Sequence, residues 1–292
     1  LADRNLVEMG EDETLGLHQT LSAVARTQLP VEVTNRHRDY YLALVDEDRE
    51  DWQRIEIIYE QISFAWAQLS KDTVATVDFV NKVGIFQIRR GLWADRLNWL
   101  HLAYESAKLN ADIPAKAHMM NNLGFAYSAL GNNLQALKYY EQALPLWRQA
   151  GNKMGEATTL NNIGGAYDDL GDKSQALTYY LQALPLRRQV ADKSGEASTL
   201  NNLGGTYSDL GDKLTAISYI EQALSLMQQV GNKAGEANIH NNLGVLYRSL
   251  GHAEQSLKCY ESALHLLRQV GDKAGEANTL SNIGALYDSL GD

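Results

Sequence analysis

The second half of the chain repeats itself every forty residues, with no insertion or deletion between copies. Variants of the phrase Asn-Asn-Leu-Gly, each followed by a tyrosine and a Leu-Gly pair, begin at residues 121, 161, 201, 241 and 281. Equal spacing means that every copy is a structurally equivalent unit. Such a period is the signature of stacked repeats rather than of a globular domain, because each unit contacts only its neighbours.

Each unit is predicted to form two amphipathic helices. The first apolar stripe, spaced as one face of a helix, consists of Leu160, Ile163, Gly164, Tyr167 and Leu170. The second stripe consists of Ala176, Leu177, Tyr180, Ala183 and Leu184. Between them, Gly171 is expected to end the first helix and Asp172 to cap the second. The sequence therefore predicts an all-α solenoid of helix pairs.

The repeat register fades toward the N-terminus. Gly84 and Gly91 stand forty residues before glycines of the next unit, whereas residues 1–33 show no match. We expect a cap or the remnant of a preceding domain at 1–33, degenerate helical repeats at 34–116, and four and a half regular units at 117–292. Since the chain does not begin with methionine and stops inside the pattern, we expect it to be a fragment of a longer protein.

The repeat resembles the tetratricopeptide repeat. The residues that carry the resemblance in one unit are Ile163, Gly164, Tyr167, Ala176, Tyr180 and Ala183. The forty-residue period, with Thr-Leu-Asn-Asn-Ile at 159–163, is similar to the kinesin-light-chain subclass and its bacterial relatives. The resemblance implies a right-handed superhelical solenoid of antiparallel helix pairs, with first helices on the concave side. Ile220 departs from the pattern because it replaces the second-helix tyrosine, which we interpret as a packing variation.

A second resemblance covers the first hundred residues. Glu13-Thr14-Leu15-Gly16-Leu17-His18, a helix expected at 19–28, and the segment 38–44 resemble the junction between the winged helix of a STAND-class signalling NTPase and its C-terminal repeats. This resemblance implies an alternative function, the sensor or autoinhibitory arm of such an NTPase. No Walker A sequence is present to form the nucleotide site itself.

A row of asparagines on the first helices is the candidate binding surface. The asparagine two residues before the helix glycine recurs in all five copies, as Asn122, Asn162, Asn202, Asn242 and Asn282. An amide both donates and accepts, so a row of amides can pair with the N–H and C=O groups of an extended peptide. Tetratricopeptide proteins that this chain resembles use that position for peptide backbone contacts. The preceding asparagines are further candidates: Asn121, Asn161, Asn201 and Asn241.

An alternative explains the same asparagines, namely that they hydrogen-bond between neighbouring helices and hold the superhelix together. Charge along the same surface bears on the partner. Asp168, Asp169 and Asp209 make its middle acidic and predict a protein or peptide partner with basic residues, although a solvated face is the alternative, and Arg248 reverses the charge in a later unit. The positions of a known carboxylate clamp hold no Lys or Arg, because they are His118, Ser198, Asn238 and Asn278.

Composition argues against several other functions. The 26 Lys and Arg residues against 36 Asp and Glu give a net charge of -10, which disfavours nucleic acid and anionic membranes. Cys259 is the single cysteine, so a reducing, cytoplasmic compartment is expected. The seven histidines lack metal-ligand spacing, and we expect no cofactor, no metal and no enzymatic activity. Self-association through the exposed C-terminal repeat is a further hypothesis.

Overall fold

The structure is a computed structural model, and it describes part of the chain. The residues described are 73–290 together with 7–9, 15–17, 40, 41, 43, 55, 56, 59, 60, 62, 63, 65 and 66. They divide into two compact units, residues 1–110 and 111–292. The helix expected at 19–28 lies outside the described residues, as does most of the predicted junction with a signalling NTPase. The domain boundaries expected at residues 33 and 116 stay predictions.

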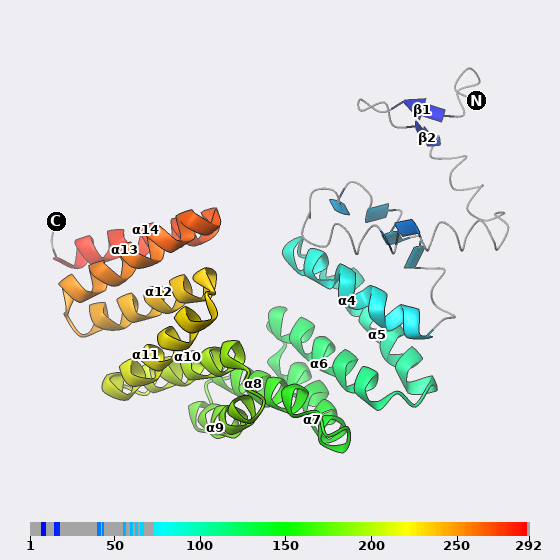
Figure 1. The fold of residues 1–292 in the computed structure, drawn as a ribbon, viewed down its shortest axis with the longest axis horizontal. Helices are drawn as coiled ribbons and strands as arrows, with labels where there is room; N and C mark the ends of the chain where they lie inside the picture. Colours follow the sequence, from blue (N-terminus) through cyan, green and yellow to red (C-terminus); the bar gives the residue numbers. More distant parts are fainter. Residues whose placement is uncertain are drawn as a thin grey trace. The chain divides into compact units, whose positions relative to one another are not determined.

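The first unit combines a short strand pair with helices. Strand β1 (Val7–Met9) pairs antiparallel with β2 (Leu15–Leu17), so that Val7 faces Leu17 (Figure 1). Two of its helices are α4 (Thr73–Arg89) and α5 (Trp93–Leu109), which pack on each other. Their core is aromatic: the Trp66 and Trp99 rings stack with centroids 4.8 Å apart, and Phe79 lies 5.6 Å from Trp66.

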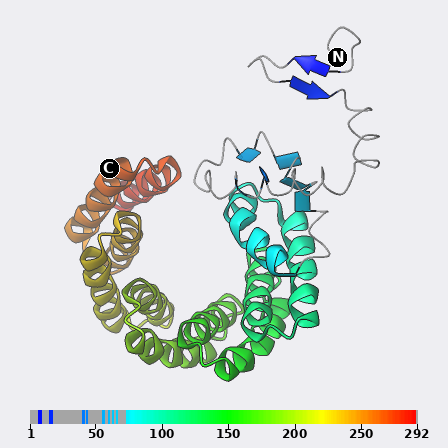
Figure 2. The same cartoon turned by 45° about the vertical axis from the view of Figure 1, so that its right-hand side comes forward.

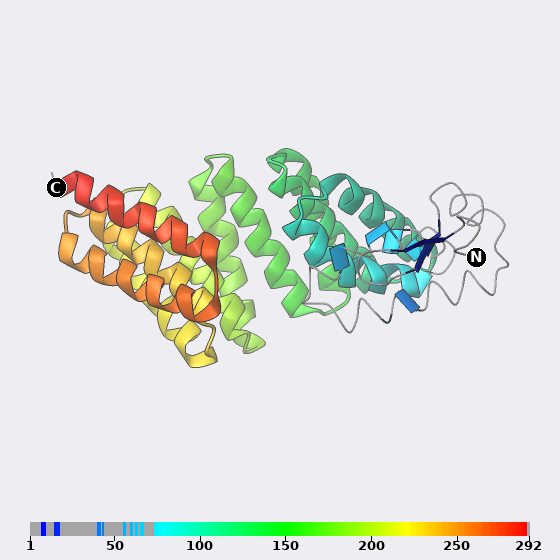
Figure 3. The same ribbon diagram turned by 90° about the horizontal axis from the view of Figure 1, so that it is seen from above.

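The second unit consists of equivalent helix pairs. Its helices are α6 (Ile113–Ala129), α7 (Asn133–Gln149), α8 (Lys153–Asp169), α9 (Lys173–Gln189), α10 (Lys193–Asp209), α11 (Lys213–Val230), α12 (Lys233–Ser249), α13 (Ala253–Val270) and α14 (Lys273–Leu290). In Figure 2 they follow one another around an arc from green to red, and from above they lie side by side as rods (Figure 3). The even-numbered helices, α6 to α14, are the first helices of their units. The predicted all-α solenoid of helix pairs is confirmed for this unit.

The helix ends follow from the turn residues. Gly171 has φ of 84°, a left-handed conformation that favours glycine, and it ends the first helix as predicted. Asp172 caps α9, because its Oδ1 accepts a hydrogen bond of 3.1 Å from the Gln175 N–H. Leu170 does not belong to the buried stripe, contrary to the prediction. It is 45% exposed because α8 ends at Asp169 and the chain turns away.

A close contact between the two helices of a unit explains the helix glycine. The ring of Tyr180 in α9 is 3% exposed and lies directly against Gly164 in α8. A methyl group on Gly164 would stand 2.7 Å from ring carbons Cδ1 and Cε1, which is inside van der Waals contact. The same tyrosine–glycine contact recurs in two other units, between Tyr140 and Gly124 and between Tyr260 and Gly244. Glycine therefore allows the second helix to pack closely beneath the first.

Candidate functional site

The asparagines of successive first helices are hydrogen-bonded to one another. Asn121 Oδ1 on α6 accepts a bond of 3.1 Å from Thr159 Oγ1 and one of 3.3 Å from Asn162 Nδ2, both on α8. The same two bonds, at 3.1 and 3.3 Å, join Asn161 to Thr199 and Asn202 one unit later. We call this row, formed by residues 121, 122, 161, 162, 201, 202, 241, 242 and 282, the asparagine ladder.

The ladder changes in its later half. Asn201 Oδ1 accepts a single bond from Asn242 Nδ2, of 2.9 Å, because Ile239 stands where α8, α10 and α14 have a threonine. Asn241 instead donates from Nδ2 to Thr279 Oγ1 on α14, also at 2.9 Å. Each ladder bond thus joins two neighbouring units, as the architectural alternative expects.

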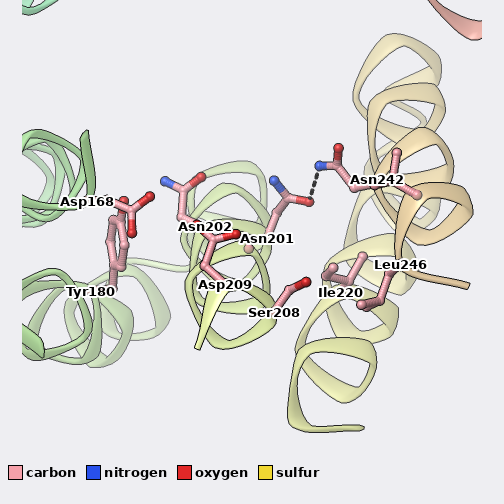
Figure 4. Close-up of a pocket in the computed structure, with 11 residues that line it drawn as sticks. Asp168, Tyr180, Asn201, Asn202, Ser208, Asp209, Ile220, Asn242 and Leu246 are labelled. Carbon is pink, nitrogen blue, oxygen red and sulfur yellow. Dashed lines mark hydrogen bonds between the residues drawn. The ribbon is translucent and has the colours of Figure 1, made fainter. Parts of the chain in front are cut away.

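The bond between Asn201 and Asn242 leaves part of both amides available. Asn201 uses its Oδ1 and Asn242 its Nδ2, so that Asn201 Nδ2 and Asn242 Oδ1 make no hydrogen bond among the described residues. In Figure 4 both atoms point to the same side, away from Ile220 and Leu246. An amide donor beside an amide acceptor matches the N–H and C=O groups of a peptide backbone. The ladder can therefore join the helices and still offer hydrogen bonds outward.

A hollow lies beside the ladder in the middle of the second unit, and we call it the central hollow. Its volume is about 290 Å³. It spans three successive first helices, α8, α10 and α12, with one side chain each from α9 and α11 (Figure 4). Its lining residues are Asp168, Tyr180, Asn201, Asn202, Gly205, Ser208, Asp209, Ile220, Asn242, Val245 and Leu246. The structure therefore brings five of the predicted site residues together here: Asn201, Asn202, Asn242, Asp168 and Asp209.

The carboxylates at this hollow already hold a cation of the same chain. Lys173 Nζ, from the start of α9, lies 3.1 Å from Asp168 Oδ1 and 2.6 Å from Asp209 Oδ2. Hydrogen bonding to Asp209, opposed by partial burial, raises the pKa of Lys173. Thr206 Oγ1 also donates to Asp168 Oδ1, at 2.9 Å. The acidic middle is thus one ammonium group between two carboxylates, and one negative charge is left uncompensated by Lys173.

Other predicted residues lie apart from the central hollow. Asp169 Oδ2 accepts a bond of 3.3 Å from Asn133 Nδ2 and does not line the hollow. Arg248 is half-buried in the last turn of α12 and is likewise absent from the lining. Asn121 and Asn122 line a second hollow of about 330 Å³ with His118 and Trp147. Asn162, Asn161, Asn241 and Asn282 lie on first helices outside the lining of both hollows.

Sequence reasoning missed three kinds of residue. Thr159 and Thr199 complete the ladder, and their signal was that a threonine stands three residues before the second asparagine in three of the five copies. Lys173 was missed although a Gly-Asp-Lys phrase recurs at the start of second helices. Ile220 was interpreted as a packing variation, and only the structure places it with Gly205 in the lining of one hollow.

Among the residues that the structure describes, no helix combines the length and apolarity needed to cross a membrane. In the same part of the chain no three His, Cys, Asp or Glu side chains gather in a way that could hold a metal ion.

A row of equivalent helix pairs with a polar ladder along its first helices defines a helical-repeat interaction scaffold. The chain belongs to the tetratricopeptide repeat family, whose sequence model matches residues 116–189, 178–229, 195–269 and 235–292. The resemblance drawn from the repeat phrase is confirmed. Tetratricopeptide repeats are typically non-catalytic, which is consistent with the interaction function expected from the sequence. A comparison with curated proteins gives no match.

Solved structures share the fold. A putative kinesin light chain with nearly identical repeats from Podosopora anserina has a TM-score of 0.53 and 12% identity, over 70% of this chain and 99% of that one. A STAND protein with a tetratricopeptide repeat sensor from Pyrococcus horikoshii has a TM-score of 0.64 and 16% identity, over 98% of this chain and 48% of that one. NprR in complex with its cognate peptide NprX has a TM-score of 0.65 and 18% identity, over 94% and 78%.

Proposed function

We propose that the chain is an interaction scaffold that binds an extended peptide segment of a partner protein along the asparagine ladder. The observation that carries this proposal is the unused amide edge: Asn201 Nδ2 and Asn242 Oδ1 point outward together beside the central hollow. A peptide backbone needs one donor and one acceptor per residue, which an asparagine side chain supplies whatever the peptide's sequence.

The chemistry of the surroundings supports a peptide over other ligands. The net charge of -10 opposes nucleic acid, and the uncompensated carboxylate beside Lys173 favours a partner that carries basic residues. NprR, which shares the fold, is seen with a peptide bound, and this supports the proposal by analogy of fold.

The experiment must separate binding from architecture, because the same asparagines join the helices. A randomised peptide library displayed on phage is panned against the protein, and the strongest peptide is then titrated by calorimetry. The double variant Asn201→Ala, Asn242→Ala removes the outward Nδ2 and Oδ1 atoms and with them up to two peptide hydrogen bonds. At about 0.5–1.5 kcal/mol each, we expect binding to weaken roughly tenfold or more.

The matched control removes hydrogen bonds between the first helices and leaves every asparagine in place. Thr159→Val, Thr199→Val deletes the hydroxyls that donate to Asn121 and Asn161, while the outward amides stay in place. Both threonines are fully buried, so the control should cost about 1 kcal/mol of stability per site and leave peptide affinity unchanged. Unchanged affinity in the asparagine variant, or an equal loss in both variants, would contradict the proposal.

A second candidate function is the sensor or autoinhibitory arm of a STAND-type signalling NTPase. The observation that favours it is the similarity to a STAND protein over 98% of this chain, where the chain corresponds to 48% of that protein. The test is the gene sequence upstream of Leu1. A P-loop followed by a winged helix would support this function, and an upstream region that encodes neither would refute it.

A further inference from the structure

One unit of the solenoid departs from the others beneath the ladder. Where Tyr140, Tyr180 and Tyr260 pack under the first helices of their units, α11 has Ile220. Ile220 is 2% exposed and covers Gly204 with its Cγ1 and Cδ1 atoms, as the tyrosines cover their glycines. An isoleucine side chain ends there, whereas a tyrosine continues with the outer part of its ring and a hydroxyl. The sequence shows that isoleucine replaces tyrosine here, and the structure shows that the shorter side chain leaves space.

The missing hydroxyl leaves space at the next residue of the first helix. A methyl group on Gly165 would lie 3.7 Å from Tyr180 Oη, in ordinary contact. A methyl group on Gly205, the equivalent residue one unit later, would meet no atom within 4 Å. The residues at this position in two other units are larger, Phe125 and Val245. The central hollow therefore exists because Ile220 and Gly205 occur in the same unit.

The walls of the hollow differ in chemistry from floor to rim. Ile220 and Leu246, each 2% exposed, make its inner side apolar, and Val245 is a further apolar lining residue. Asp168 and Asp209 stand at its edge, where they already hold the ammonium group of Lys173. Tyr180 is neutral there, because burial, with the nearby Asp168 and Asp169 charges, raises its pKa. An occupant that matches both parts has an aliphatic stem and a cationic end.

We propose that the central hollow is an anchor pocket for one lysine or arginine side chain of the bound peptide. The stem lies against Ile220 and Val245, and the cationic group shares Asp209 and Asp168 with Lys173. The peptide backbone beside this residue bonds to Asn201 Nδ2 and Asn242 Oδ1. This inference rests on the proposed peptide-binding function. It adds that the peptide carries a basic side chain and that the unit containing Gly205 and Ile220 selects this side chain.

Ile220→Tyr tests the pocket without threatening the fold. Tyrosine is the residue of the equivalent site in three other units, so the variant should unfold at a temperature equal to or above that of the original protein. Its hydroxyl would enter the hollow beside Gly205. Ile220→Val is the matched control, because it keeps the hollow open.

The probe is the same randomised peptide library, panned against the original protein, Ile220→Tyr, Ile220→Val and Asp209→Asn. We expect the original protein and Ile220→Val to select peptides with one fixed Lys or Arg position. Ile220→Tyr should lose that preference yet still select peptides, and Asp209→Asn should weaken it. In titrations, replacing the selected basic residue by norleucine should weaken binding about tenfold in the original protein and leave Ile220→Tyr unaffected.

The outcomes separate the two proposals. Selected peptides without a fixed basic position, or an equal basic preference in Ile220→Tyr, would overturn the anchor pocket. The proposed peptide binding along the asparagine ladder would be unaffected by that result. If apolar residues are selected at this position as often as Lys or Arg, the hollow binds an aliphatic side chain without regard to charge. That result would also overturn the anchor pocket. If the original protein selects no peptide, the proposed peptide binding along the asparagine ladder is refuted, and the anchor pocket is refuted with it.

Discussion

Two neighbouring glycines of α8 should respond in opposite ways to the same substitution. In Gly164→Ala, the added methyl group would stand 2.7 Å from two ring carbons of Tyr180, about 1 Å closer than carbon atoms pack. The ring is 3% exposed and closely packed against α8, so either the ring or the two helices must move to admit the methyl group. Overpacking costs roughly 1–3 kcal/mol, and alanine's better helix propensity returns about 0.5–1 kcal/mol. The net expectation is a loss of about 1 kcal/mol, with an upper bound of about 2.5 kcal/mol.

Gly165→Ala is the matched control. Its methyl group would meet only Tyr180 Oη, at 3.7 Å, so the propensity gain of about 0.5–1 kcal/mol should appear without a steric cost. Urea unfolding followed by circular dichroism measures both variants, with midpoints compared at equal slope. The reasoning is refuted if Gly164→Ala unfolds at the same urea concentration as the original protein, or if Gly165→Ala is destabilised as much as its neighbour.

Three further predictions concern stability and assembly. Burial, partly opposed by Glu236, lowers the pKa of His240 below 6.5, so the stability that depends on neutral His240 is complete above pH 6.5 and is lost as pH falls below it. His240→Leu, which introduces the residue of the preceding unit, should make the melting temperature depend less on pH between about pH 5 and 7. An unchanged pH dependence of the melting temperature would contradict this. Asn152→Ala removes the cap that accepts the 2.9 Å bond from the Gly155 N–H and should cost about 1 kcal/mol in urea unfolding, whereas Asn152→Asp should cost little. Leu280 and Tyr287 leave apolar area on α14 exposed by 49% and 43%, so light scattering should show a mass that rises with concentration and falls again in Leu280→Glu; a constant mass excludes self-association.

The repeat period made most of the fold predictable. Equal spacing places residues such as Gly164 and Tyr180 in equivalent positions, so one unit's helix pattern holds for all. The exception is Leu170, where the periodic pattern continues one residue beyond the end of the helix. The pair β1 and β2 lies in the stretch that has no repeat register, and nothing in the pattern predicted it.

The surface that carries the candidate site was predictable from the sequence, but its hydrogen-bond partners and the central hollow were not. Helical phase places Asn161 and Asn202 on one surface, yet which amide atom bonds to which neighbour depends on how helices forty residues apart pack. The central hollow depends on a side chain that is shorter than its counterparts. Ile220 reads in the sequence as a packing variation, and only its placement beside Gly205 gives that variation a consequence.

The proposed peptide binding along the asparagine ladder is tested most directly by NMR. The side-chain amide signals of asparagine in a ¹⁵N-labelled sample are recorded while the peptide selected from the library is added. Binding along the ladder predicts that the Asn201, Asn202 and Asn242 amides shift with the titration. The amides of Asn132 and Asn232, which cap α7 and α12 away from the central hollow, should stay in place. Shifts confined to these caps, with unmoved ladder amides, would contradict peptide binding in the groove.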